Sequence, residues 1–128
     1  MIFSLAGCGG HGFPAVGSVT SATMSISASD GSKYLWTISD PEKLTQIVAF
    51  VDGRRTGWSK LWYGTPVPIV EVRLFDGDIH KGVFGVGKNF FETQREGSFF
   101  SKRASSSDVR DFLKMLDVDD ATFKEFAK

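Results

Sequence analysis

The chain has few of the residues that build disulfide or metal-stabilised frameworks: its 128 residues include one cysteine and two histidines. A single cysteine cannot form an intrachain disulfide. Cys8 and His11 form a Cys-x-x-His pair, which by itself lacks the four ligands of a structural zinc site. We therefore expect neither an oxidised framework nor a structural zinc site.

Two further absences narrow the function. No stretch approaches the roughly 18 apolar residues of a membrane-spanning helix. Fifteen Lys and Arg residues balance fifteen Asp and Glu residues, so the chain has no basic surplus for displacing counterions from a polyanion. The sequence predicts no nucleic-acid partner. A hydrophobic fraction of 41% with 12 phenylalanines is instead typical of a globular chain, and this length favours one domain.

Alternating apolar residues predict the strands. Three apolar residues alternate with serines before Asp30-Gly31 and three follow it, namely Met24, Ile26, Ala28, Tyr34, Trp36 and Ile38. Alternation on both sides of an Asp-Gly pair is a hairpin signal. Apolar residues alternate again over residues 70–74 and from residue 79, and residues 90–93 and 98–101 form two further strand-like runs. Phe84 and Val86 indicate either a second apolar face or a bulge near Gly82 and Gly85. These runs predict a four-stranded antiparallel meander.

Two amphipathic helices are predicted before and after the meander. Asp40 can cap the first with Pro41 at its first helical position, or Ser39 and Glu42 can form a capping box. The second opens in the serine run 105–107. Apolar residues then recur at helical spacing on one face, namely Leu44, Ile47, Val48 and Val51 in the first helix and Val109, Phe112, Leu113 and Leu116 in the second.

The C-terminal residues predict a short last helix. Asp119 or Asp120 would cap it, and it would carry Phe123 and Phe126. The whole order of elements predicts an α+β fold in one domain over residues 22–128: an antiparallel sheet, made of the N-terminal hairpin and the meander, with both amphipathic helices on one face. The order resembles the β-α-β4-α arrangement of each half of TATA-binding proteins. This resemblance is architectural, and a shared fold implies no shared function.

The N-terminal residues 5–8, Leu-Ala-Gly-Cys, resemble the lipobox of bacterial lipoproteins, in which the cysteine is lipidated and becomes the mature N-terminus. The resemblance implies lipidation at Cys8, a signal remnant before it, and a location in the cell envelope. Gly9 stands where an Asp commonly signals inner-membrane retention in such proteins, which favours the outer membrane in a two-membraned bacterium. In residues 9–21 the apolar residues follow neither the helical nor the strand period, so this segment is predicted to be a flexible tether. The alternative is a cytoplasmic protein with one free thiol.

Two motif matches have simpler explanations. The run 82–88 has the G-x-x-x-x-G-K spacing of a phosphate-binding loop, but Asn89 follows where a Mg²⁺-binding hydroxyl is needed, and a strand-like run comes next. Two short Asp-rich segments, at residues 76–78 and 117–120, have neither the length nor the distal Glu of a calcium-binding loop. We therefore predict no cofactor and no metal.

The segment 53–66 is the predicted contact surface, because it is long for a helix-to-strand link and concentrates aromatic and cationic side chains. Its candidate residues are Arg54, Arg55, Trp58, Lys60, Trp62 and Tyr63. The function predicted is a non-enzymatic, lipid-anchored envelope module that binds a protein, a peptide or a cell-wall glycan. One alternative is an enzyme whose site draws on Glu71, Glu92, His80 or Asp78; another is an inhibitor or immunity protein.

Overall fold

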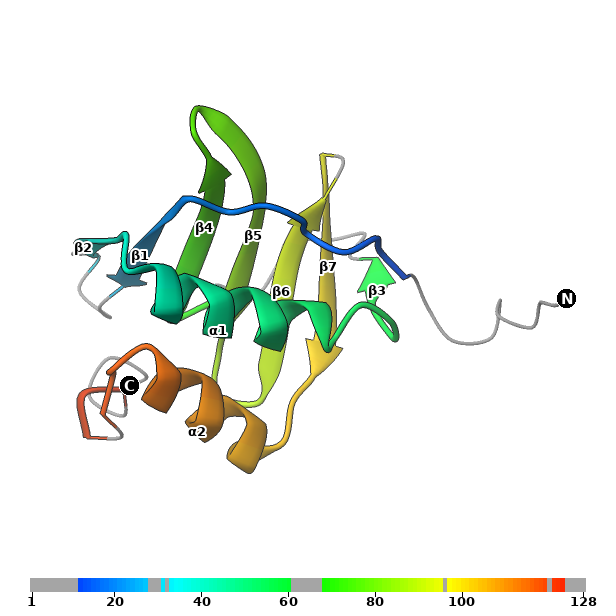
Figure 1. Ribbon diagram of the computed structural model, residues 1–128. Coiled ribbons are helices and arrows are strands. Elements are labelled where there is room, and N and C mark those ends of the chain that lie inside the picture. Colours follow the sequence, from blue (N-terminus) through cyan, green and yellow to red (C-terminus); the bar gives the residue numbers. More distant parts are fainter. Residues whose placement is uncertain are drawn as a thin grey trace, which may run out of the picture.

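The computed structural model describes residues 12–27, 31, 33–60, 68–95, 97–119 and 121–123. The chain folds into one seven-stranded sheet, in which every pair of neighbouring strands is antiparallel. Both long helices lie on the same face of that sheet (Figure 1). The α+β class predicted from the sequence is therefore confirmed.

The sheet has the spatial order β2-β1-β4-β5-β6-β7-β3. The elements are β1 (Ser21–Ser27), β2 (Lys33–Ile38), α1 (Pro41–Asp52), β3 (Ser59–Lys60), β4 (Val70–Asp76), β5 (Ile79–Val86), β6 (Phe90–Arg95), β7 (Ser98–Arg103) and α2 (Ser106–Met115). The hairpin β1–β2 and the meander β4–β7 are both present as predicted, and β1 joins them by pairing with β4. The sequence does not predict β3, because two residues are too few to show a period.

Each long helix begins at a side-chain cap. The Asp40 carboxylate accepts a hydrogen bond from the Glu42 amide at 3.3 Å, and Pro41 is the first helical residue. The Ser105 hydroxyl accepts from the Asp108 amide at 3.1 Å at the start of α2. The buried residues are Leu44, Ile47 and Val51 in α1 and Val109, Phe112 and Leu113 in α2. The predicted apolar faces are therefore the faces that cover the sheet.

The core lies between this helix layer and the central strands. Its centre is aromatic: the ring of Phe84 on β5 lies 5.1 Å from those of both Phe91 on β6 and Phe112 on α2, measured between centroids. Phe50 of α1 packs edge-on against Phe91 at 5.7 Å. Aromatic pairs at such distances add to the free energy of burial. This cluster fixes both helices against β5 and β6.

A β-bulge interrupts the β4–β5 pairing. Leu74 pairs with Gly82 and Phe75 pairs with His80, so Lys81 has no opposite residue. Gly82 has a φ of 147°, a backbone conformation that L side chains rarely adopt. Of the two alternatives that the sequence left open near Gly82, a bulge or a second apolar face, the bulge is present.

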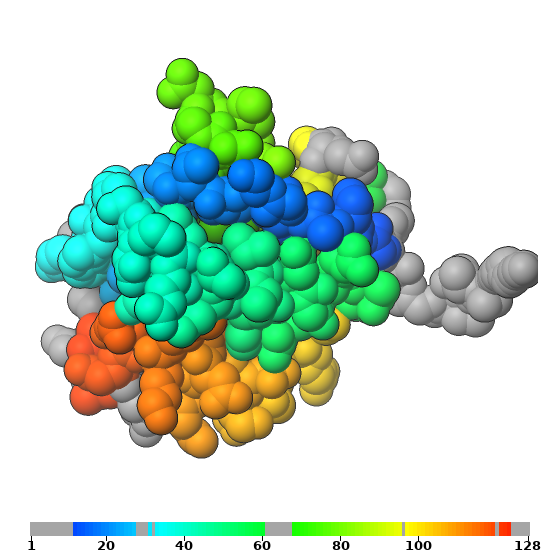
Figure 2. Space-filling model, viewed as in Figure 1, coloured from blue at the N-terminus to red at the C-terminus, as the bar shows by residue number. Residues whose placement is uncertain are grey.

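The N-terminal segment 12–20 packs against the domain, so the predicted tether over residues 9–21 is wrong from residue 12 onwards. Val16 is buried, its amide donates to Asp52 Oδ1 at 2.9 Å, and the Phe13 amide donates to the Arg55 carbonyl at 2.8 Å. Ser21 already belongs to β1. The segment runs along α1 on the helix-covered face of the sheet (Figure 2). Residues 9–11 lie outside the described residues.

The cap of the last predicted helix is present. The Thr122 amide donates to the Asp119 carboxylate at 2.7 Å, residues 121–123 are helical, and Phe123 is buried. Asp119 is therefore the capping residue of the two that the sequence left open. Phe126 lies outside the described residues.

Candidate functional site

The predicted contact surface over residues 53–66 is not a single exposed patch. Among its described residues, Arg55 is exposed, Arg54 and Lys60 are half-buried, and Trp58 is buried. Trp62 and Tyr63 lie outside the described residues. The aromatic and cationic side chains therefore do not form one surface. Those of Arg54 and Trp58 contact other parts of the domain.

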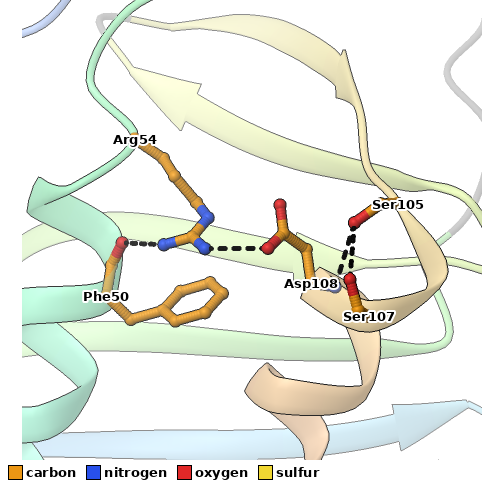
Figure 3. Close-up of polar contacts among 5 residues, drawn as sticks. All are labelled: Phe50, Arg54, Ser105, Ser107 and Asp108. Carbon is orange, nitrogen blue, oxygen red and sulfur yellow. Dashed lines mark hydrogen bonds and ion pairs between the residues drawn. The ribbon is translucent and has the colours of Figure 1, made fainter.

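Arg54 links the end of α1 to the start of α2 (Figure 3). Its guanidinium carbon lies 3.5 Å from the centroid of the Phe50 ring, and its Nη1 donates to the Phe50 carbonyl at 3.1 Å. Its Nη2 donates to Asp108 Oδ1 at 3.3 Å. Asp108 lies in the first turn of α2, where Ser105 caps the helix. The side chain therefore holds the two helices together.

Replacing Arg54 tests this assignment. We expect Arg54→Ala to lower the free energy of unfolding by about 1–2 kcal/mol, because a cation–π contact and a partly exposed ion pair are lost together. Arg55→Ala is the matched control, since its side chain is exposed, and it should change stability by less than about 0.5 kcal/mol. Urea denaturation monitored by circular dichroism measures both. Equal losses in the two variants would contradict the assignment.

Trp58 belongs to the core and is not an exposed contact residue. Its side chain is 1% exposed, and its ring packs edge-on against Phe84 with centroids 6.0 Å apart. The indole Nε1 donates to the Arg54 carbonyl at 2.6 Å. A buried indole that is hydrogen-bonded within its own loop is structural. In this respect the sequence-based prediction is wrong, because aromatic composition does not show which way a side chain points.

Of the acidic and histidine candidates for an enzyme, Glu71 and Glu92 lie near each other, whereas Asp78 and His80 lie elsewhere. Glu71 on β4 and Glu92 on β6 both lie opposite Gly85 of β5, in the middle of the sheet. Asp78 is in the β4–β5 turn and His80 pairs with Phe75 beside that turn, where both are exposed. Within the part of the chain that the structure describes, no three His, Cys, Asp or Glu side chains are grouped to hold a metal ion.

Glu92 is nevertheless an unusual residue. It is 4% exposed, and its Oε2 atom has no hydrogen-bond partner among the residues that the structure describes. Pro68 covers the neighbouring Gly85 so closely that a Cβ there would lie 2.9 Å from Pro68 Cβ. Desolvation, with a smaller contribution from the charge of Glu71, raises the pKa of Glu92 to about 7. Such a carboxyl can exchange a proton near neutral pH, but neither His80 nor Asp78 lies beside it to share a catalytic task.

The most exposed apolar surface lies on β2, one of the two edges of the sheet. Tyr34 is 48% exposed, Leu35 68% and Trp36 46%. Tyr34 and Trp36 pair with Ile26 and Met24 of β1, so they lie on the helix-covered face, whereas Leu35 lies on the other face. The two aromatic rings have centroids 6.5 Å apart. We call Tyr34, Leu35 and Trp36 the β2 edge surface.

A pocket of about 370 Å³ opens beside Trp36 on the helix-covered face. Its floor is apolar, formed by side chains such as Met24, Ile26, Leu116 and Val118. Its rim carries Lys43 and Asp117, which form an ion pair, together with Asp119. Hydrogen bonds from Thr122, the backbone amide first, lower the pKa of Asp119 and keep its carboxylate ionised. The rim therefore carries two carboxylates and one ammonium around an apolar floor.

Sequence reasoning missed the β2 edge surface for a definite reason. Alternation of Tyr34, Trp36 and Ile38 predicts a strand with one buried face. It does not show whether a second strand covers the outer side, because that depends on which strands pair across the sheet. One feature of the sequence could have indicated an exposed apolar edge: the strand over residues 33–38 has several large apolar residues and only one charge, at Lys33.

Comparison of the chain with protein-family models, curated proteins and solved structures finds no significant match. The likeness to TATA-binding proteins therefore stays a resemblance in element order alone. Of the helices that the structure describes, none has the length and apolar character to cross a bilayer. Cys8 lies outside the described residues, so its lipidation stays a prediction.

Proposed function

We propose that this protein is a non-enzymatic binding module of the bacterial envelope, which takes up an extended polypeptide segment as an additional strand beside β2. The observation that carries the proposal is the exposed edge strand itself. Every residue from Lys33 to Thr37 is exposed, and three of these five residues are large and apolar. Partner strands commonly add to exposed sheet edges of this kind.

The chemistry of an edge strand favours a polypeptide over a glycan. The outer side of an edge strand presents backbone N–H and C=O groups with which an extended chain can pair. Soluble proteins usually protect such an edge with charges, proline or a bulge. In β2 only Lys33 is charged, and there is no proline. The edge is therefore suited to strand pairing.

The pocket beside Trp36 supplies side-chain selectivity. In strand addition, main-chain hydrogen bonds provide affinity while pockets for alternate side chains provide specificity. The apolar floor favours an aliphatic or aromatic side chain, and Asp117 and Asp119 on the rim favour a neighbouring cationic or hydroxyl group. The preferred partner segment therefore alternates apolar residues with polar or basic ones.

The envelope location rests on the lipobox resemblance, and the structure is compatible with it. Gly12 begins the described chain, and Phe13 packs on Phe100 of β7 with centroids 4.9 Å apart. Gly12 comes four residues after Cys8, so a lipid on Cys8 would lie within about 14 Å of the domain. β2 is five strand spacings from β7, or roughly 24 Å, so attachment at Cys8 leaves the β2 edge clear.

Strand addition is tested with a library of extended ten-residue peptides that alternate apolar and polar residues. We expect selected peptides to slow hydrogen exchange of the β2 amides, because pairing protects the outward-pointing N–H groups. Trp36→Ala should weaken binding about tenfold, the usual cost of losing a central aromatic contact. Ile79→Ala is the control, since Ile79 is 64% exposed but lies at the β4–β5 turn. Binding that survives Trp36→Ala and protects no β2 amide would contradict the proposal.

Attachment is tested separately. The native gene product should fractionate with membranes, and Cys8→Ala should release it. Mass spectrometry of that product should show a diacyl or triacyl group on Cys8 and no residues before it. An unmodified thiol on an intact N-terminus would overturn the lipid anchor while leaving the β2 site in place.

A further inference from the structure

We propose that a cationic surface formed by Arg55, Arg95 and Lys102, at the opposite end of the sheet from β2, binds the anionic lipid headgroups of a membrane. This inference goes beyond strand addition at β2. It rests on the proposed lipid at Cys8 only for the choice of a membrane as the partner, because that lipid would bring a bilayer close to this end of the domain.

Positive charge is concentrated at one end of a chain whose net charge is zero. Residues 53–60 and strands β6 and β7 contain six cationic residues: Arg54, Arg55, Lys60, Arg95, Lys102 and Arg103. Among the described residues of these segments the one carboxyl belongs to Glu92, which is buried. Glu96, between β6 and β7, lies outside the described residues. The neutral composition therefore conceals a basic end of the sheet.

The strand register places two residues of the cationic surface on the helix-covered face. Lys102 pairs with Phe91, a core residue beneath the helices, and directly opposed residues share a face. Side chains alternate along a strand, so Ser98, four residues before Lys102, lies on that face together with its partner Arg95. Arg55 follows the end of α1, which covers the same face (Figure 1).

The cationic surface surrounds the point at which the N-terminal segment meets the domain. The guanidinium carbon of Arg95 lies 5.0 Å from the centroid of the Phe13 ring, and the Phe13 amide donates to the Arg55 carbonyl at 2.8 Å. The Lys102 ammonium donates to the carbonyl of Thr56, the residue after Arg55, also at 2.8 Å. All three cationic residues therefore lie around Phe13 and Thr56.

The two carboxylates next to this surface already have partners within the domain. Asp108 accepts a hydrogen bond from Arg54 at 3.3 Å, and Asp52 accepts from the Val16 amide at 2.9 Å. Arg54 thereby offsets the charge of Asp108. Arg55 is exposed and Lys102 is half-buried. The surface therefore keeps an excess of positive charge that solvent can reach.

The position of this surface favours a bilayer as its partner. Cys8 lies four residues before Gly12, so a lipid on Cys8 would lie within about 14 Å of the residues that contact Arg55. An anionic leaflet attracts cations within roughly one Debye length, about 8 Å at physiological salt. Each such cation strengthens binding about fivefold. The surface would therefore hold this end of the domain against the leaflet, with β2 at the far end.

Sedimentation with lipid vesicles tests the surface on the full chain without an acyl group. In low salt, vesicles that contain about 30% phosphatidylglycerol in phosphatidylcholine should bind at least about twentyfold more strongly than pure phosphatidylcholine vesicles. Salt at about 0.5 M should remove this preference, because it screens exposed charges.

A charge reversal locates the binding surface. Arg55→Glu should weaken binding to the anionic vesicles at least about tenfold, because it replaces an attracted charge with a repelled one. Lys33→Glu is the matched control, since it makes the same change of charge on exposed β2 at the other end of the sheet. It should change binding less than about twofold. Circular dichroism checks that both variants are folded.

Four outcomes would overturn the inference. They are equal binding to the two kinds of vesicle, equal losses in Arg55→Glu and Lys33→Glu, displacement of the vesicles by inorganic phosphate at matched ionic strength, and tighter binding to a short DNA duplex than to the anionic vesicles. The third would indicate a site for free phosphate and the fourth a nucleic-acid partner.

These measurements are independent of the tests of the proposed function, because the chain in them carries no lipid and no peptide. Vesicle binding through Arg55 by a protein whose native Cys8 proves unmodified would leave the cationic surface in place without the anchor. A lipid on Cys8 with no preference for anionic vesicles would leave the anchor in place and remove the cationic surface. Peptide binding at β2 is unaffected by either result.

Discussion

Glu92→Gln should make the protein more stable at pH 8 by about 2–3 kcal/mol, an unusual result for substituting a buried residue. Glutamine has nearly the same shape as glutamic acid and carries no charge. At pH 8 the native protein must keep an ionised carboxylate at a residue that is 4% exposed, and no described residue forms a hydrogen bond with its Oε2 atom. The variant removes that cost. Urea denaturation at pH 4, 6 and 8 measures the effect.

The direction of the pH dependence follows from the raised pKa. In the folded protein the pKa of Glu92 is about 7, against 4.5 for the unfolded chain, so the folded state binds the proton more tightly. The stabilising contribution of the protonated carboxyl is fully present below pH 4.5. It is lost as the pH rises towards 7, and the loss is on the order of 3 kcal/mol. Native and Glu92→Gln proteins should therefore differ little at pH 4 and most at pH 8.

Glu71→Gln separates the two causes of the shift. Desolvation is the larger cause and the charge of Glu71 the smaller, so removing that charge should reduce the pH dependence without abolishing it. Glu71 also accepts a hydrogen bond from Arg73 at 3.1 Å, which glutamine can still accept. A native protein whose stability rises between pH 5 and pH 7 in step with Glu92 ionisation would contradict the assignment.

Trp58→Ala should cost about 3–5 kcal/mol, which is the range for truncating a fully buried aromatic residue. The loss combines the cavity beside Phe84 with an unsatisfied carbonyl at Arg54, which now accepts the indole hydrogen bond. Trp36→Ala is the matched control within the same chain, because Trp36 is 46% exposed on an edge strand. It should cost less than about 1 kcal/mol.

The two tryptophan variants also distinguish a structural role in the core from a binding role at the β2 edge. Trp58→Ala should lower stability, whereas Trp36→Ala should leave the fold intact and weaken pairing at β2. Thermal melts and hydrogen exchange on both variants make the comparison. Similar destabilisation by both substitutions would show that β2 is held more firmly by the domain than its exposure indicates.

Local patterns predicted those elements whose signals lie within a few residues. Asp40 with Pro41 predicted the start of α1, and the spacing of Val109, Phe112 and Leu113 predicted the buried face of α2. Gly82 indicated a bulge as one of two alternatives, and its φ of 147° is a backbone conformation that residues other than glycine rarely adopt. Each of these features depends on backbone geometry or on a period that the sequence carries directly.

The candidate site could not be predicted in the same way. Arg54 and Trp58 were candidate contact residues, yet both have structural contacts. Trp36 was not a candidate, yet it lies on the exposed edge. The segment 12–20 shows no period, because individual hydrogen bonds and ring contacts hold Val16 and Phe13 to the domain, and no repeating apolar face does so. Such contacts leave no pattern in the sequence.

By itself the sequence determined the succession of the longer strands and helices, where the helices begin and which faces they bury, because hydrophobic period and capping chemistry act over one or two turns. The tertiary structure decided which strand lies at the edge, how deeply Glu92 is desolvated, and where Trp58 points. These features depend on the pairing of β1 with β4 and of β3 with β7, between residues far apart in the chain. Whether a strand lies at the edge of a sheet depends on which strands pair with it, and only the assembled sheet determines that pairing.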